Sequence, residues 1–266
     1  MGRRRIDALL VELGHFGSRE QGRAAILAGE VKVGGLAVTK AGELVDEDAQ
    51  ITVAERRRFV SRGGDKIAGA LTEFDVAVEG RRAVDVGAST GGFTDCLLQA
   101  GAASVAAVDV GYGQLAWSLR TDPRVTVFER TNIRHADPVS LGAPFDLVVA
   151  DVSFIALRTV LPALVALMGS EADLIALVKP QFEAGKGRVG KRGVVKDATV
   201  HVDVLTDVIA AVGDAGLVVR GLTVSPIKGP EGNIEFWILA SRSGERVAVD
   251  VSSVVSRAHG ATGGSL

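Results

Sequence analysis

The sequence predicts an α/β fold in which a doubly wound, Rossmann-like sheet follows a small α+β domain. Three observations lead to this prediction. From residue 83 to about residue 241, strand-like apolar runs alternate with helical segments, which is the βαβ rhythm of a parallel sheet. A glycine-rich turn, within AVDVGASTGGFTD at residues 83–95, separates the first of these runs from a helix. The first part of the chain instead contains two short helical stripes and a hairpin pattern.

The small domain begins with two predicted helices. Residues 5–13 place aliphatic side chains on one helical stripe. Ser18 then has the character of an N-cap, and Gln21, three residues later, completes a capping box for a second helix. The run VKVGGLAVTK predicts a β-hairpin around its two glycines, and a further strand is expected at residues 50–54.

A basic stretch, RRRFVSRGG, separates the two parts of the chain. We place the small domain at residues 1–59, a linker at residues 60–63 and the large domain at residues 64–241. The large domain opens with a helix in DKIAGALTEF. After about residue 242 the periodic pattern dissolves, so residues 242–266 are expected to form a partly disordered tail.

The composition of the 266 residues excludes several classes of protein. A hydrophobic content of 47% is ample for a core, and a net charge of −2 argues against a uniformly basic nucleic-acid binder. The single cysteine, Cys96, suits a reducing compartment and a core position, and four scattered histidines predict no metal site. No apolar run reaches the roughly 18 residues needed to span a bilayer. We therefore expect a cytoplasmic protein, a monomer, with no metal and no membrane-spanning segment.

The glycine-rich turn predicts a nucleotide-like cofactor. Its spacing, G-x-x-x-G-G from Gly87, matches neither a dinucleotide fingerprint nor a phosphate loop. Asp85 lies just before the turn, where it would repel phosphate but suit a cation. Asp109 ends the next apolar run, at a distance where an acid commonly holds ribose hydroxyls. These features favour S-adenosyl-L-methionine, which carries a sulfonium and no phosphate. A tight turn without any ligand is the alternative.

Four charged residues stand at places where a globular domain rarely puts them. Lys66 begins the first helix of the large domain, and Glu235 interrupts an apolar strand. Asp151 and Lys179 each end an apolar run, at the strand edge where α/β sheets bind ligands. Taken singly, each could be a solvated terminus. Together they predict one site at the carboxyl edge of the sheet.

The small domain resembles the S-four RNA-binding domain. The resemblance rests on R-x-D-x-x-L-x-x-x-G near the N-terminus, and then on Ser18-Arg19 followed by Gly29-x-Val31-x-Val33-x-Gly35. In that family the second helix and the hairpin form the RNA surface. The residues that fall on this surface here are Arg4, Arg5, Ser18, Arg19, Arg23 and Lys32.

The large domain resembles FtsJ-like ribose 2′-O-methyltransferases. Lys66, Asp151, Lys179 and Glu235 match their K-D-K-E tetrad in order. With the segments DVGASTGGFTD, ADVSF and VKPQFE, residues 1–241 resemble the TlyA family, whose members methylate cytidine ribose in ribosomal RNA and are also named haemolysins. The resemblance implies a Rossmann-like methyltransferase sheet, S-adenosyl-L-methionine as cofactor, and the RNA of the small or large ribosomal subunit, or of both, as partner.

The resemblance also implies roles for residues. The tetrad would be catalytic: Lys179 would be the base or a hydroxyl-orienting cation, Asp151 and Glu235 would orient it, and Lys66 would help hold the 2′-hydroxyl. The cofactor would be bound by Asp85, Gly87, Ala88, Ser89, Thr90, Gly91, Gly92 and Phe93 around its methionine end, by Asp109 at the ribose, and by Asn132 and Ile133 at the adenine. Asn132 as a plain turn residue is the alternative.

Further cations are expected to contact RNA from the large domain. They are Arg62 in the linker and Lys186, Arg188, Lys191 and Arg192 in the glycine-rich run KGRVGKRGVVK. Each cluster could also be ordinary solvated surface. The linker departs from the family pattern Arg-x-Trp-Val, because Phe59 stands where the tryptophan is usual.

Three other functions are weighed against ribose methylation. A pseudouridine synthase also carries this RNA-binding domain, but its large domain is largely antiparallel. A membrane-lytic haemolysin would need an amphipathic lytic segment, which the sequence lacks. An RNA-binding module with an inactive enzyme fold is disfavoured because all four tetrad positions are intact.

Overall fold

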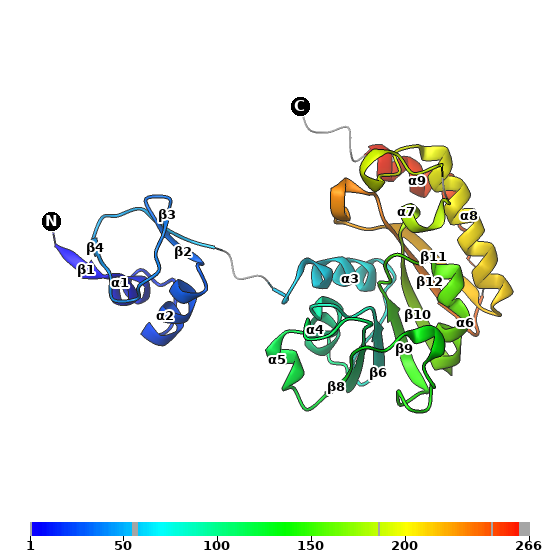
Figure 1. Cartoon of the computed structure of the whole chain (residues 1–266), viewed down its shortest axis with the longest axis horizontal. Coiled ribbons are helices and arrows are strands. Elements are labelled where there is room, and N and C mark those ends of the chain that lie inside the picture. The colour runs from blue at the N-terminus through cyan, green and yellow to red at the C-terminus, as the bar shows by residue number, and fades with distance from the viewer. Residues whose placement is uncertain (1, 55–57, 186, 246, 261–266) are drawn as a thin grey trace. The chain divides into compact units, whose positions relative to one another are not determined.

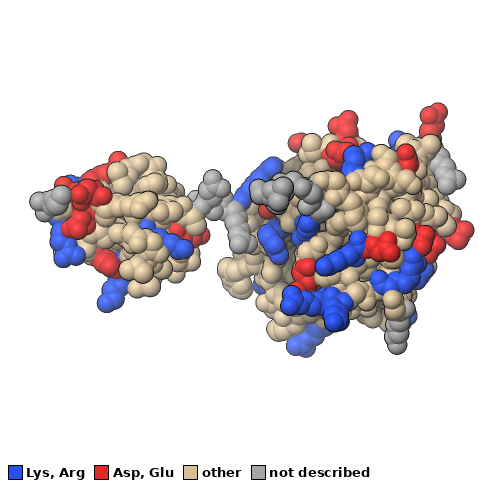
Figure 2. Space-filling view, turned by 90° about the horizontal axis from the view of Figure 1, so that it is seen from above, with Lys and Arg blue, Asp and Glu red and all other residues tan. Residues whose placement is uncertain are grey.

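The computed structural model describes residues 2–54, 58–185, 187–245 and 247–260, and the chain divides into two units (Figure 1). The first unit is Met1–Arg57 and the second is Arg58–Leu266. Each unit has its own hydrophobic core. Figure 2 shows Lys and Arg side chains interspersed with Asp and Glu side chains over the visible face of each, in keeping with the small net charge.

The first unit packs two short helices on small antiparallel strands. Its elements in chain order are β1 (Arg3–Arg5), α1 (Ile6–Glu12), α2 (Arg19–Leu27), β2 (Val31–Val33), β3 (Leu36–Ala37), β4 (Leu44–Asp46) and β5 (Ile51–Val53). β2 pairs with β3 and β5, and β1 pairs with β4. The core is formed by aliphatic side chains such as Ile6, Leu10 and Ile26, which are almost completely buried.

The local sequence signals of this unit act much as predicted. Ser18 caps α2 by accepting a hydrogen bond from the Gln21 N–H at 3.3 Å. The Gln21 side chain reaches back one residue further than a capping box requires and accepts from the Gly17 N–H at 3.1 Å. Gly34 and Gly35 both have positive φ, which suits the two-residue turn of the hairpin.

The second unit is a seven-stranded sheet covered by helices on both faces. Its helices are α3 (Arg62–Glu73), α4 (Gly92–Gln99), α5 (Trp117–Arg120), α6 (Leu157–Leu167), α7 (Pro180–Glu183), α8 (Ala198–Asp214) and α9 (Val251–Gly260). Its strands are β6 (Arg82–Val86), β7 (Ser104–Val108), β8 (Val125–Phe128), β9 (Phe145–Ala150), β10 (Met168–Val178), β11 (Val218–Val224) and β12 (Phe236–Ser241).

The strand order is β11-β12-β10-β9-β6-β7-β8. Among these strands β12 alone runs antiparallel to its neighbours β10 and β11, and the other pairings are parallel. The carboxyl ends of β6, β7, β9 and β10 therefore lie at one edge of the sheet, and the start of β12 lies at the same edge. The predicted doubly wound α/β sheet is confirmed.

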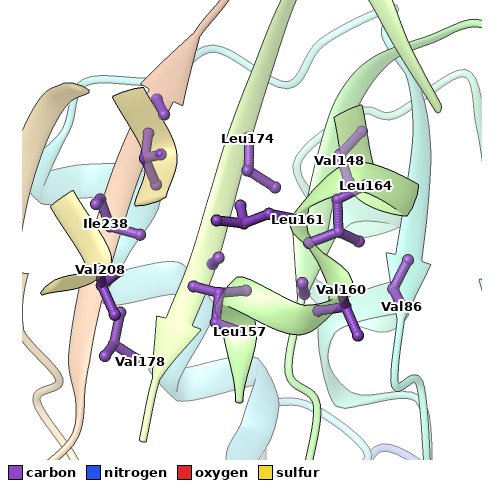
Figure 3. Packing of buried hydrophobic residues seen from close by; sticks show 14 of the residues in the cluster. Val86, Val148, Leu157, Val160, Leu161, Leu164, Leu174, Val178, Val208 and Ile238 are labelled. Carbon is purple, nitrogen blue, oxygen red and sulfur yellow. The ribbon is translucent and has the colours of Figure 1, made fainter. Parts of the chain in front are cut away.

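Alternate residues of each strand enter two separate core clusters, as the two-residue period of a strand requires. Val148 and Leu174 point into the cluster under α6 and α8, where they pack with Leu161 and Leu164 (Figure 3). Leu147, one position earlier than Val148, belongs to the other cluster under α3 and α4. Both faces of the sheet are thus buried, which explains the nearly continuous apolar runs in the sequence.

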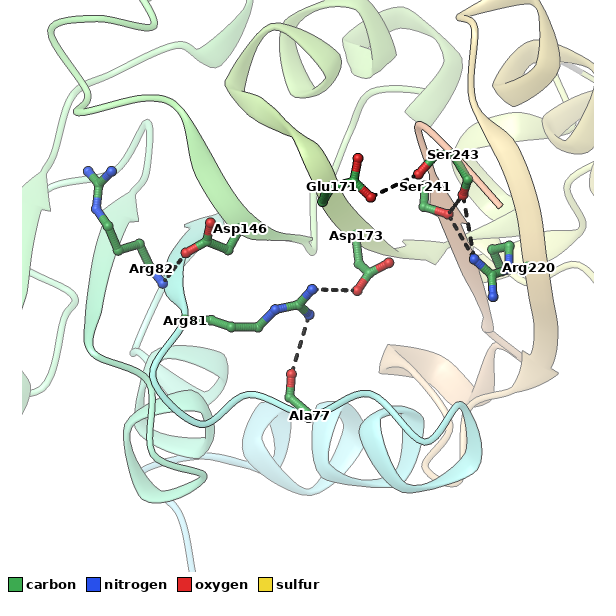
Figure 4. A network of polar contacts seen from close by, with 9 residues as sticks. All are labelled: Ala77, Arg81, Arg82, Asp146, Glu171, Asp173, Arg220, Ser241 and Ser243. Atoms are coloured by element: carbon green, nitrogen blue, oxygen red, sulfur yellow. Dashed lines mark hydrogen bonds and ion pairs between the residues drawn. The ribbon is translucent and has the colours of Figure 1, made fainter. Parts of the chain in front are cut away.

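A polar network lies near the amino ends of the parallel strands, at the opposite end of the sheet from the predicted site (Figure 4). Arg81 Nη2 donates to Asp173 Oδ2 at 2.8 Å, and the Arg82 N–H donates to Asp146 Oδ2 at 2.9 Å. These bonds tie the start of β6 to β9 and β10. We assign this edge a structural role.

Two predictions about boundaries need correction. The linker expected at residues 60–63 belongs to the second unit, because α3 begins at Arg62 and Phe59 is buried in the core cluster under α3. The segment 58–64 is fixed to α4: the Val60 N–H donates to Asp95 Oδ2 at 2.8 Å, and Gln99 Nε2 donates to the Arg58 carbonyl at 3.0 Å.

The tail expected at residues 242–266 contains a helix. α9 buries Val254, Val255 and Ala258 against α8 and β11. The apolar stripe of α9 is short and follows a polar stretch. The sequence alone therefore does not show a clear helical period there, and the stripe is recognised from the surface that it covers. Residues 261–266 lie outside the described residues.

Candidate active site

A sharp turn follows β6 at the carboxyl edge of the sheet. Gly87 has φ +91°, and a Cβ there would lie 2.4 Å from the Asp151 carbonyl oxygen. Only glycine permits this close approach of two backbones. The Ser89 N–H donates to Asp109 Oδ2 at 2.8 Å, and the Gly111 N–H donates to Asp109 Oδ1 at 2.6 Å. Asp109 therefore holds the turn after β6 against the turn after β7.

A hollow of about 330 Å³ opens between these turns and the segment after β9. Five of the residues predicted to bind the cofactor line it, namely Gly87, Ser89, Asp109, Asn132 and Ile133. Sequence reasoning missed other parts of the wall, including Val110, Gln114 and the residues Val152–Ile155. Such a volume is at the lower end of small-molecule sites. Asn132 also accepts from the Arg134 N–H at 3.1 Å, so it serves as a turn cap as well as a wall residue.

The remaining residues predicted to bind the cofactor lie behind the wall. Ala88 and Phe93 are buried in the core cluster under α3 and α4, and Gly92 packs against the segment 58–64. Thr90 and Gly91 complete the turn, and neither lines the hollow. These residues shape the turn from outside the hollow.

Asp85 supports the turn from within the core. Its side chain is fully buried, and Oδ2 accepts from the Thr94 N–H at 3.0 Å and from Thr94 Oγ1 at 2.7 Å. The carboxylate thereby caps the first turn of α4. Burial raises its pKa to about 7, an effect that the bonds from Thr94 oppose. Asp85 is not among the residues that line the hollow, and its side chain supports the turn after β6 from within the core.

The structure brings the four predicted catalytic residues together as two ion pairs. Lys66, from α3, places Nζ 2.6 Å from Oε2 of Glu235, which immediately precedes β12. Lys179, just after β10, pairs with Oδ1 of Asp151, just after β9. Lys66, Lys179 and Glu235 are buried. Burying a charge is costly unless an opposite charge compensates it. In each of these ion pairs the carboxylate compensates the charge of the lysine.

Ser153 adds a contact that the sequence did not reveal. Lys179 Nζ donates to Ser153 Oγ at 2.8 Å. The ammonium is therefore held between a carboxylate and a hydroxyl on the segment that follows β9. The only signal in the sequence is that Ser153 stands two positions after Asp151 in the run DVSF.

An exposed aromatic residue follows Ser153 in the chain. Phe154 is 92% exposed and has φ +64°, an unusual conformation for a bulky residue. Its ring centroid lies 5.3 Å from that of Phe182 in α7. The next residue of α7, Glu183, is buried, and its Oε1 accepts from the Leu157 N–H at the start of α6. Burial raises the pKa of Glu183.

The predicted RNA-binding cations of the first unit differ in how they are paired. Arg5 and Arg19 both bind the buried carboxylate of Asp7, at 2.8 Å and 2.9 Å. Their guanidinium groups hold the pKa of Asp7 well below its usual range, against the effect of burial. Arg4 forms ion pairs with Glu12 and Glu47. Arg23 and Lys32 are exposed, and no ion pair joins either to another described residue.

The predicted cations of the second unit are also at the surface. Arg62 is exposed at the start of α3, and Lys191 and Arg192 are exposed in a 3₁₀ turn at Lys191–Gly193. Arg188 pairs with Asp203 of α8. Lys186 lies outside the described residues.

Within the described parts of the chain, no group of three or more His, Cys, Asp or Glu side chains could hold a metal ion. No described helix is both long enough and apolar enough to cross a membrane.

Comparison with known proteins finds two matching families. The FtsJ-like methyltransferase family matches residues 59–242, and the S4 domain, the S-four domain above, matches residues 4–51. The 16S/23S rRNA (cytidine-2′-O)-methyltransferase TlyA of Mycobacterium tuberculosis is 50% identical over 238 residues, which cover 89% of each chain. YqxC of Bacillus subtilis is 47% identical over 264 residues, covering 96% of this chain and 94% of that protein.

A solved structure is similar along nearly the whole chain. It is a hemolysin-named protein from Streptococcus thermophilus, which is 41% identical and superposes with a TM-score of 0.76. The match covers 99% of this chain and 98% of that chain.

Proposed function

Because the chain belongs to the TlyA family of FtsJ-like methyltransferases, we propose that it transfers a methyl group from S-adenosylmethionine to a ribose 2′-hydroxyl of ribosomal RNA. The observation that carries this proposal is the pairing of Lys66 with Glu235 and of Lys179 with Asp151 at the sheet edge that also forms the hollow. An RNA-binding S-four domain in the same chain supplies the substrate class.

The wall of the hollow suits S-adenosylmethionine. Each oxygen of Asp109 already accepts one backbone N–H, and a carboxylate oxygen can accept a second bond, as ribose hydroxyls would offer. Val110 and Ile133 give the apolar wall that an adenine ring needs. Gly87 lets the turn after β6 lie directly against the Asp151 backbone, which brings the cofactor hollow next to the predicted catalytic residues. When bound, the cofactor supplies a methyl group on a sulfonium centre.

Lys179 is placed to orient the acceptor hydroxyl. A lysine ammonium has three N–H donors and no acceptor. Asp151 and Ser153 engage two of these donors, which leaves the third for a ribose oxygen. Holding that oxygen in line with the methyl group to be transferred lowers the barrier to the reaction, because the reacting atoms are already in position. This geometry favours an orienting role for Lys179, since it could accept the hydroxyl proton only after losing one of its own.

Lys66 and Glu235 complete the site from the other direction. The carboxylate of Glu235 has essentially no exposed surface, and it holds the Lys66 ammonium in place. A second fixed ammonium near the acceptor oxygen would stabilise the negative charge that develops on the 2′-oxygen as its proton passes to solvent water.

The RNA substrate is proposed from the relatives and from the surface. The mycobacterial relative is named for cytidine-2′-O methylation of 16S and 23S rRNA, and we propose cytidine ribose in one or both subunits here. Arg23 and Lys32 of the first unit, and Arg62, Lys191 and Arg192 of the second, offer exposed cations to phosphates. Such contacts give salt-dependent affinity with little sequence information.

Methyl transfer to isolated ribosomal subunits tests this function. Purified protein and tritiated S-adenosylmethionine are incubated with small and large subunits from cells that lack the gene, and ribose methylation is then mapped on the RNA. Incorporation at a cytidine 2′-oxygen, lost in Lys179→Ala, is the expected result. Methylation of bases only, or a fully active Lys179→Ala protein, would contradict the proposal.

We further propose that the protein acts in the cytoplasm as a metal-free monomer, since its proposed substrate is ribosomal RNA. Light scattering of the purified protein tests the oligomeric state, and activity after treatment with a chelator tests the metal. Haemolysin is a historical name among the relatives. Dye release from liposomes should be absent. The pseudouridine synthase alternative is not supported, because the sheet is mostly parallel and the matched family is a methyltransferase family.

A further inference from the structure

Glu183 ends the short helix that follows Lys179, and its side chain contacts the start of α6. It is only 7% exposed, and Oε1 accepts the Leu157 N–H at 2.5 Å. Leu157 is the first residue of α6, and the residue in the N-cap position, Ala156, has no side chain that could accept this bond. Glu183 therefore gives α6 the carboxylate cap that its own sequence lacks.

The bond from Glu183 is one of three links between two segments of the proposed site. One segment, residues 151–157, carries Asp151 and leads into α6. The other, residues 179–183, carries Lys179 and forms α7. Lys179 contacts Asp151 and Ser153 near the start of the first segment. The ring of Phe154 meets that of Phe182 in the middle. Glu183 fastens the far end, at Leu157.

The middle of the first segment needs such support. Phe154 has φ +64°, a conformation that costs a bulky residue free energy and persists only where neighbouring contacts impose it. Asp151 and Ser153 lie within three residues of this position. With its far end released, the segment can relax, and the two oxygens that hold Lys179 Nζ would move with it.

We propose that Glu183 is a positioning residue for methyl transfer: its carboxylate, by capping α6, fixes the segment that holds Lys179. This inference rests on the proposed function, and it adds a residue outside the tetrad that does not touch substrate. Misplacement of a reacting group by about 1 Å can cost roughly 10²-fold in rate. Removing the tether is therefore expected to lower kcat by about 10- to 100-fold, with a smaller change in KM for the ribosomal subunit.

A cap restored from within α6 separates positioning from stability. In Glu183→Ala the helix loses its cap, and Ala156→Ser supplies a new one from the N-cap position, whose extended backbone suits a serine. In the double variant α6 is capped again, but no side chain at position 183 joins α7 to it, and only the longer bond from Arg158 Nη2 to the main-chain carbonyl of residue 183, at 3.4 Å, remains. We expect Glu183→Ala to lower both Tm and kcat, and the double variant to recover Tm while kcat stays low. Ala156→Ser alone should keep kcat within twofold of the unchanged protein.

The outcomes are decisive in both directions. A Glu183→Ala protein with kcat within twofold of the unchanged protein overturns the inference, and so does a double variant that recovers kcat together with Tm. If the alanine variants do not fold, Glu183→Asp is used, because it keeps the charge but withdraws the carboxylate from Leu157. A tenfold or larger loss of kcat in that folded variant supports the inference, and a smaller loss overturns it.

The conservative variant gives a second readout. Glu183→Gln keeps an acceptor oxygen of the same reach, so it should retain several-fold more activity than Glu183→Ala. The unchanged protein serves as the reference in each assay. If it does not methylate ribosomal RNA ribose, the proposed function fails. If it does and Glu183→Ala is equally active, only the present inference fails.

Discussion

Lys66 and Glu235 are 169 positions apart in the sequence, and the Lys66 ammonium lies 2.6 Å from the Glu235 carboxylate. Lys66 lies in α3, the first helix of the second unit, and Glu235 is the residue just before β12, the last strand. Glu235 is 1% exposed, so its charge depends on this partner for compensation. The pair therefore serves both the stability of the unit and the proposed chemistry, and these two roles can be separated.

Glu235→Ala leaves the Lys66 ammonium buried without its partner. Breaking a buried ion pair in this way costs about 3–5 kcal/mol of unfolding free energy. Replacing both residues by apolar ones, in Lys66→Met with Glu235→Leu, removes both charges and should recover most of that loss. Urea denaturation measures stability, and methyl transfer to ribosomal subunits measures activity. We expect both proteins to be inactive, although the double variant is stable. An active double variant would show that neither residue is needed for the reaction.

Asp85 makes stability depend on pH. Its pKa of about 7 in the folded chain exceeds its ordinary value of 3.8, so between these two pH values the folded chain binds more protons than the unfolded chain. The contribution of this group is fully present below about pH 4 and is lost as pH rises through 7. The loss is at most on the order of 4 kcal/mol.

Asp85→Asn removes this titration while keeping an oxygen for Thr94. We expect the variant and the unchanged protein to have similar unfolding free energies near pH 4 and the variant to be the more stable by a few kcal/mol at pH 8. Urea denaturation at several pH values measures the difference between them. A difference that stays constant across this range would contradict the assignment.

Gly92 allows the segment 58–64 to lie on the start of α4. A Cβ at this position would lie 2.3 Å from Ser61 Oγ and 2.7 Å from the Gly64 nitrogen. Gly92→Ala must therefore displace the segment or the turn that bounds the hollow. We expect at least tenfold weaker binding of S-adenosylmethionine, measured by calorimetry, and a lower Tm.

Gly213→Ala in α8 is the matched control for Gly92→Ala. Nothing lies within 4 Å of the Cβ that it would add, and it should stabilise the helix by up to about 1 kcal/mol. Equal cofactor affinity in the two variants would show that the segment 58–64 does not influence the cofactor site.

Phe154 offers an exposed aromatic face one residue after Ser153, which binds Lys179, and a nucleobase of the substrate could stack on it. Because the side chain is 92% exposed and glycine adopts a positive φ without strain, Phe154→Gly should change the unfolding free energy little. We expect KM for ribosomal subunits to rise about tenfold. Phe154→Trp keeps a stacking surface and should stay close to the unchanged protein. Unchanged KM in the glycine variant would remove Phe154 from the substrate site.

Arg23 and Lys32 should contribute more to RNA affinity than Arg19 does. Arg19 already binds Asp7, whereas no ion pair joins Arg23 or Lys32 to a described residue. Arg23→Ala and Lys32→Ala are each expected to reduce the slope of log affinity against log salt by about one. Filter binding to ribosomal RNA at several salt concentrations measures this slope. If Arg19→Ala changes the slope more than either Arg23→Ala or Lys32→Ala does, the pairing of Arg19 with Asp7 does not weaken the contact of Arg19 with phosphate.

The sheet and the ends of its strands could be predicted because each strand is marked by a pattern of neighbouring residues in the sequence. An apolar run that ends in a charged residue marks a strand end, and parallel strands bring such ends to one edge. Asp151 and Lys179 were found in this way. The contact of Ser153 with Lys179 could not be found, because it joins side chains 26 positions apart on the segments that follow two different strands.

Pairings between particular side chains were the other part that the sequence did not reveal. Arg5 and Arg19 were predicted only as cations on an RNA surface, and the structure joins both to Asp7. Asp85 was predicted only as a cofactor contact, and the structure shows that its carboxylate caps α4. In both cases the residue type was informative, but the direction of the side chain is set by packing.

The antiparallel course of β12 has a consequence for how the protein is made. Glu235 comes just before the last strand of the sheet, so a ribosome synthesises it after the other three charged residues of the site. A nascent chain that has folded its first unit and most of its sheet still leaves Lys66 without its partner. On the proposed mechanism, a protein that modifies ribosomal RNA would therefore become active only near the end of its own synthesis, and a prematurely terminated chain would bind RNA without methylating it.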